Sequence, residues 1–231
     1  FIMPITDLLT RNAKEYPNET ALVEINPELS EPSRITWNEY ELVQPTSTVP
    51  YRREISWSVL DEKANRCANL LLNRGIKAGQ KVGILLMNCL EWLPIYFGIL
   101  KCGAIAVPLN FRYTSNEIDY CVKLADIDVL FFGPEFIGRM EAIANDLSKE
   151  TILFYVGSPA PSFAEDYFHW VANFSSIAPN IELKDEDNAE FEFELNLDTE
   201  ETRAKIRSIV NVPMIVESVF NKASVPPLIV K

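Results

Sequence analysis

The feature that most constrains the fold is the alternation of strand-like and helix-like segments between residues 56 and 157. Residues 81–87 (KVGILLM) are apolar without polar alternation, which is typical of a strand buried on both faces of a parallel sheet. The other expected strands are 104–109, 128–132 and 151–156. The expected helices run from Ser58 to Gly75, over 91–101, from Thr114 to about Leu124 and from Pro134 to about Leu147. Strands that alternate with helices form βαβ units, so we predict a doubly wound, mostly parallel α/β sheet with flanking helices.

Local signals support these helix ends. Ser58 has Asp61 three residues later, an arrangement typical of a capping box, and Thr114 with Glu117 forms a second one. Gly75 is placed to end its helix in the left-handed conformation.

The segments around this core are less regular. We expect a helix over 5–16 and a strand over 20–25, followed by a proline-rich loop or insert over 26–53. Beyond Gly157 we expect an edge strand at 191–195, because FEFEL alternates strictly, and a helix over 200–210. The predicted organisation is an α/β subdomain over 1–157 and an acidic tail over 158–231 that contains none of the eight glycines.

The charge of the chain excludes some partners. The formal net charge is −12, and residues 182–201 contain ten acidic residues and one lysine. Nucleic-acid binding requires clustered Lys and Arg, so we expect no nucleic-acid partner. No apolar run is long enough for a membrane span, and the opening FIMPITDLL lacks the basic region of a signal peptide, so we expect a cytoplasmic protein.

The chemistry-bearing residues are few. Neither a phosphate-binding glycine loop nor a nucleophile elbow occurs, and a catalytic triad would depend on His169, the single histidine, which we interpret as a packing or surface residue. The four cysteines lack metal-ligand spacing, so we expect reduced core cysteines and no metal site. The one candidate ligand residue is Arg112, because it follows the carboxyl end of strand 104–109, where ligands of open α/β sheets bind. It could contact a phosphate or carboxylate; the alternative is a surface arginine paired with Asp or Glu.

Two segments of the chain resemble, in the same order, the N-terminal domain of the AMP-forming, adenylate-forming enzymes. They are ITDLLTRNAKEYPNETALV and ISWSVLDEKANRCANLLLNRGIKAGQKVGILLMNCLEWLPIYFGILKCGAIAVPLNFRYTSNEIDYCVKLADIDVLFF. Within that family VPLNFRYT resembles acyl-CoA synthetases, since amino-acid adenylation domains tend to carry an aspartate at the position of Asn110. The resemblance implies a parent enzyme that uses ATP, Mg2+ and coenzyme A to activate a small-molecule carboxylic acid.

The chain also departs from that family. DEDNAEFEF looks like the lead-in to the family's phosphate loop, but no Ser/Thr/Gly-rich run follows, so we carry over no catalytic residue. We therefore expect ATP, Mg2+ and CoA not to bind tightly to this segment. Two hypotheses follow: an inactive N-terminal part of an acyl-CoA synthetase, or a non-catalytic α/β interaction module without a nucleotide site. A homo-oligomer is compatible with either.

Overall fold

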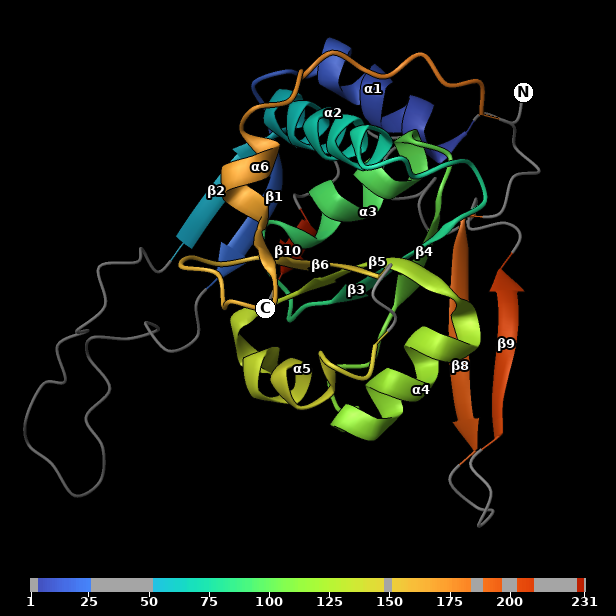
Figure 1. Ribbon diagram of the computed structural model, residues 1–231. Helices are drawn as coiled ribbons and strands as arrows, with labels where there is room; N and C mark the ends of the chain where they lie inside the picture. The colour runs from blue at the N-terminus through green and yellow to red at the C-terminus, as the bar shows by residue number, and fades with distance from the viewer. Residues whose placement is uncertain are drawn as a thin grey trace, which may run out of the picture.

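The computed structural model describes residues 4–25, 52–147, 151–183, 189–196, 203–209 and 228–230. These residues form two sheets with helices around them (Figure 1). The helices are α1 (Ile5–Glu15), α2 (Trp57–Asn73), α3 (Trp92–Lys101), α4 (Ser115–Ala125), the 3-10 helix η2 (Pro134–Phe136), α5 (Ile137–Ile143) and α6 (Tyr167–Val171). The strands are β1 (Thr20–Ile25), β2 (Arg52–Ser56), β3 (Lys81–Leu85), β4 (Ile105–Pro108), β5 (Ile127–Phe132), β6 (Ile152–Tyr155), β7 (Glu165–Asp166), β8 (Glu190–Asn196), β9 (Arg203–Ile209) and β10 (Leu228–Val230).

The larger sheet has the strand order β7-β6-β5-β3-β4-β8-β9. Its neighbours pair in parallel from β7 to β8, and only β9 runs antiparallel. The chain passes from β3 to β4 on one side and then returns to place β5 on the other side, so the order reverses around β3. This is the doubly wound arrangement, and the predicted fold class is confirmed.

Helices cover both faces of this sheet (Figure 1). α1, α2 and α3 lie on one face over a core that includes Leu60, Phe97 and Phe131. α4 and α5 lie on the other face over a core that includes Ile118 and Phe132. Burial on both sides explains why 81–87 lacks polar alternation.

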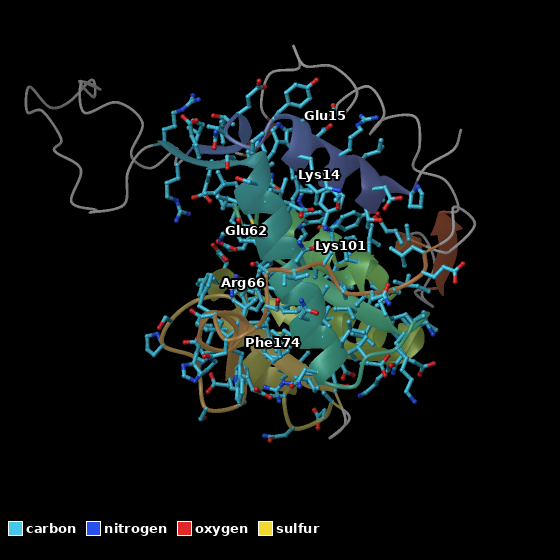
Figure 2. The ribbon with its side chains drawn as sticks, turned by 90° about the horizontal axis from the view of Figure 1, so that it is seen from above. Lys14, Glu15, Glu62, Arg66, Lys101 and Phe174 are labelled. Atoms are coloured by element: carbon cyan, nitrogen blue, oxygen red, sulfur yellow. The ribbon has the colours of Figure 1, made fainter. Side chains whose placement is uncertain are left out.

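Side chains of α2 fix the segment that follows α6. Arg66, Asn69 and Asn65 donate hydrogen bonds to carbonyl oxygens within residues 172–177. Figure 2 shows this face, with Arg66 and Phe174 labelled. Because these carbonyls belong to no strand or long helix, the α2 donors supply the partners that a packed backbone requires.

The start of α2 differs from the prediction. Ser56, not Ser58, is the N-cap, and its hydroxyl accepts from Val59 N at 3.4 Å. The Ser58 hydroxyl instead donates to the oxygen of Pro17 (2.8 Å), and the Asp61 carboxylate accepts from Lys101 (2.6 Å). Tertiary partners therefore occupy both groups of the expected capping box. The box at Thr114 and Glu117 is confirmed, as is the positive φ of +85° at Gly75.

Two predictions beyond residue 157 are wrong. The strand at 191–195 exists, but it is not an edge, because β8 pairs with β4 on one side and with β9 on the other. The helix expected over 200–210 is the strand β9. The register places Glu192 opposite Arg207 and Glu194 opposite Lys205 in the antiparallel pair of β8 and β9.

The expected loop over 26–53 lies outside the described residues up to residue 51. Its last two residues, Arg52 and Arg53, belong instead to β2, which pairs antiparallel with β1. The division of the chain at residue 157 stays a prediction.

Candidate functional site

The carboxyl edge of the larger sheet carries the candidate ligand residue. After β4 ends at Pro108, residues 110–113 form a tight turn. Tyr113 N donates to Asn110 O (3.0 Å), and Arg112 N donates to Asn110 Oδ1 (3.0 Å). Asparagine favours such turns because its side chain can bond the backbone two residues later. We call residues 110–113 the Arg112 turn.

Arg112 is exposed, and its guanidinium carbon lies 5.3 Å from the ring centroid of Phe111, which is itself 47% exposed. Within the part of the chain that the structure describes, Arg112 forms no ion pair with Asp or Glu. The role of Arg112 as a phosphate or carboxylate contact stays a prediction.

Arg139, on α5, contacts the Arg112 turn from outside it. One of its terminal nitrogens, Nη1, donates to the oxygens of Phe111 (2.7 Å) and Tyr113 (3.0 Å). The guanidinium carbon also lies 5.5 Å from the ring centroid of Phe136. Sequence reasoning missed Arg139, because a single arginine in a helix gives no signal of a partner 26 to 28 residues away.

Tyr113, at the end of the turn, is not a base near neutral pH. Burial, together with the nearby Cys121 and Glu117, raises the pKa of its hydroxyl to about 12. The hydroxyl therefore stays protonated, and the carboxylate of Glu117 is engaged by the backbone and hydroxyl of Thr114 in the cap of α4.

The structure does not bring the other chemistry-bearing residues to this edge. His169 is exposed on α6, where its ring lies against that of Trp170. All four cysteines are free; Cys67, Cys102 and Cys121 are buried. Burial raises the pKa of the Cys102 thiol to about 11, so the nucleophilic thiolate is scarce at neutral pH. Among the described residues, no group of three His, Cys, Asp or Glu could hold a metal ion.

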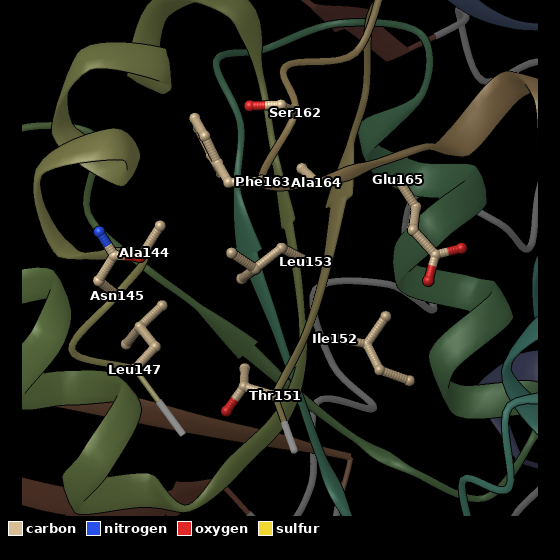
Figure 3. Close-up of a pocket in the computed structure, with 10 residues that line it drawn as sticks. All are labelled: Ala144, Asn145, Leu147, Thr151, Ile152, Leu153, Ser162, Phe163, Ala164 and Glu165. Carbon is tan, nitrogen blue, oxygen red and sulfur yellow. The ribbon is translucent and has the colours of Figure 1, made fainter. Parts of the chain in front are cut away.

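A cavity of about 480 Å3 lies elsewhere, between the end of α5, the start of β6 and residues 162–165. Figure 3 shows Leu153 and Phe163 on one side of β6 and Glu165 on the other. The Glu165 carboxylate is bound by Arg74, the C-cap residue of α2. This cavity adjoins the amino end of β6, so it is not at the carboxyl edge where ligands of doubly wound sheets bind.

Comparison with known proteins completes this description. A doubly wound sheet with polar turns at its carboxyl edge is an architecture that binds nucleotides and other small ligands. Residues 9–189 match the family of AMP-binding enzymes, which is more than half of the chain. The chain belongs to this family of AMP-binding enzymes.

Curated relatives are acyl-CoA ligases. Over 101 residues the chain is 34% identical to the medium/long-chain-fatty-acid/3-oxocholest-4-en-26-oate CoA ligase of Mycobacterium marinum, covering 43% of this chain and 18% of that protein. Over 96 residues it is 34% identical to a crotonobetaine/carnitine CoA ligase of Salmonella paratyphi B, covering 42% of this chain and 19% of the relative. These matches span about a fifth of each relative.

Solved structures share the fold. The anthranilate CoA ligase AuaEII, solved with anthranoyl-AMP, aligns with a TM-score of 0.73 at 22% identity, over 93% of this chain and 36% of that one. A fatty acyl CoA synthetase of Mycobacterium tuberculosis aligns with a TM-score of 0.66 at 20% identity, over 88% of this chain and 34% of that one. None of the helices in the described ranges is both long and apolar enough to cross a membrane.

Proposed function

We propose that this chain is the N-terminal part of an AMP-forming acyl-CoA ligase, which joins a small carboxylic acid to coenzyme A through an acyl-adenylate. The family match over residues 9–189, with relatives that are CoA ligases, is the observation that carries this proposal. Since the aligned part is about a fifth of each relative, the proposed activity belongs to a full-length protein that contains this chain.

The proposed substrates are ATP with Mg2+, CoA and the acid, and they do not fit the described residues alone. No glycine-rich loop follows a strand of the described sheet, and no acidic cluster suited to a metal ion occurs among these residues. We therefore derive no step through ATP or Mg2+ here, and we expect the 231-residue chain by itself to be inactive. We propose a cytoplasmic enzyme, in which this chain would supply the sheet that supports the rest of the active site.

The one chemical role that we assign within this chain is binding by Arg112. Its planar guanidinium can donate two parallel hydrogen bonds to a phosphate or carboxylate. The ring of Phe111, whose centroid lies 5.3 Å from the guanidinium carbon, restricts the conformations of the Arg112 side chain. Arg112 would therefore bind and orient an anionic substrate group, not transfer protons.

The test is pyrophosphate release by the full-length protein with ATP, CoA and a panel of short, long-chain, aromatic and steroid acids. Activity with at least one acid, and none from the 231-residue chain, is the expected result. Arg112→Met should raise the KM of one anionic substrate, whereas Arg52→Met, which removes an exposed arginine from β2, should not. Absence of pyrophosphate release with every acid would favour the alternative, a non-catalytic interaction module.

A further inference from the structure

Arg139 holds the Arg112 turn at two points. Its Nη1 donates to the carbonyl oxygens of Phe111 and Tyr113, the two residues that flank Arg112. The half-buried stem of Arg139 starts from α5, and the guanidinium packs near the ring of Phe136. The bond to Phe111 O holds the peptide plane before the Cα atom of Arg112, and the bond to Tyr113 O holds the plane between Tyr113 and Thr114.

The contact also joins two halves of the fold. The Arg112 turn follows β4, whereas α5 follows β5, and these strands lie on opposite sides of β3. The chain order reverses around β3, which is where doubly wound folds place their ligand crevice. Arg139 therefore bridges the region where the strand order reverses, and it links α5, which follows β5, to the Arg112 turn, which follows β4.

Apart from Arg139, the turn is held by the buried side chain of Tyr113 and by two internal hydrogen bonds. Its internal hydrogen bonds both end on Asn110, one on the backbone oxygen and one on Oδ1. Asn110, Phe111 and Arg112 are all exposed. Loss of the two Arg139 bonds would let these three exposed residues change conformation, which would move the base of the Arg112 side chain.

We propose that Arg139 is a positioning residue for ligand binding: it orders the Arg112 turn so that Arg112 meets an anionic substrate group in a fixed geometry. This inference rests on the proposed function, because it requires Arg112 to bind a substrate. Arg139 itself acts through the backbone of the turn. Arginine suits this task because one planar guanidinium nitrogen reaches two carbonyls, whereas a lysine ammonium is a point donor on a flexible stem.

The experiment compares Arg139→Met, Arg139→Lys, Arg112→Met and the double variant Arg112→Met/Arg139→Met in the full-length protein. For each variant, KM is measured separately for ATP, CoA and acid, and kcat is measured alongside. Lys123→Met, which removes an exposed cation from α4, is the matched control. Amide hydrogen exchange of a peptide covering residues 109–116 reports the order of the turn.

The expected result is a rise of about fivefold in one KM for Arg139→Met, with a smaller change in kcat, because charge-assisted hydrogen bonds to the turn are lost. The same KM should rise in Arg112→Met, and Arg139→Met should add little in the Arg112→Met background. Arg139→Lys should fall between Arg139→Met and the unchanged protein. Exchange over 109–116 should be faster in Arg139→Met and unchanged in Lys123→Met.

Four outcomes would overturn the inference. Additive effects of the two substitutions would mean that Arg139 contacts the ligand independently. Unchanged exchange over residues 109–116 would mean that Arg139 does not order the turn. A lowered melting temperature without a KM change would mean that Arg139 stabilises the fold but does not position Arg112. If Arg112→Met left every KM unchanged in an active ligase, the inference would fail while the proposed function stood; an inactive unsubstituted protein would instead remove the proposed function.

Discussion

Replacing Lys101 with methionine should destabilise the chain strongly, because Lys101 is a buried cation at the junction of three helices. The residue is 5% exposed. Its ammonium donates to Asp61 Oδ1 (2.6 Å), Asn65 Oδ1 (2.7 Å) and Thr10 Oγ1 (3.3 Å). These partners lie on α1 and α2, and Lys101 is the last residue of α3, so one ammonium links all three helices.

The magnitude follows from what the substitution leaves behind. The Asp61 side chain is 15% exposed, so without Lys101 its carboxylate is a largely buried charge with no cation in contact. Removing one partner of a buried ion pair costs about 3–5 kcal/mol. Asp61 keeps two neutral donors, Asn65 Nδ2 (3.0 Å) and Thr10 Oγ1 (3.2 Å), which lowers the expected loss to about 3 kcal/mol.

Urea unfolding of the purified chain, followed by far-ultraviolet circular dichroism, measures this loss as a shift in midpoint at constant slope. Lys123→Met is the control, since that lysine is 53% exposed in an i,i+4 pair and should change stability by less than about 0.5 kcal/mol. The double variant Lys101→Met/Asp61→Asn, which removes both charges, should recover part of the loss. A Lys101→Met variant no less stable than Lys123→Met would refute the reasoning.

Three further predictions concern local packing, capping and pH. Gly98→Ala should lower the free energy of unfolding by about 2 kcal/mol or more, because the added Cβ would lie 2.5 Å from Cβ of Cys67. Gly138→Ala is the control: an added Cβ would meet nothing within 4 Å, so the variant should be equally stable or more stable. Equal urea midpoints for the two variants would contradict this prediction. Thr114→Ala should cost about 1 kcal/mol in the same assay by removing the cap of α4, and Thr114→Ser should keep most of it. Partial burial raises the pKa of the half-buried Cys89 thiol to about 11, so the native state retains a proton that the unfolded chain loses above the ordinary pKa of 9.0. The melting temperature should therefore fall between about pH 9 and 11, less steeply in Cys89→Ser, and a flat profile would count against it.

Much of the doubly wound core was predictable because its signals are local. The apolar run at 81–87 indicates a strand covered on both faces, and the cap at Thr114 needs only a hydroxyl and a glutamate three residues apart. The misplaced start of α2 was not predictable, because the hydroxyl of Ser58 and the carboxylate of Asp61 bind residues 41 and 40 positions away. β9 was mistaken for a helix because its pairing depends on β8, which the segment itself does not reveal.

The candidate site divides in the same way. Sequence reasoning found Arg112, because the strand before it and the rule for carboxyl edges place it there. It could not find Arg139, since the contact depends on where β4 and β5 stand around β3.

By itself the sequence determined the fold class, the strands of the core and the kinship with AMP-forming enzymes, because hydrophobic periodicity and cap residues act over a few positions. Only the tertiary structure decided the strand order, the inner position of β8, the ion pair of Lys101 with Asp61 and the hold of Arg139 on the Arg112 turn. Each of these depends on groups distant in the chain and adjacent in space, and burial and charge act through that adjacency.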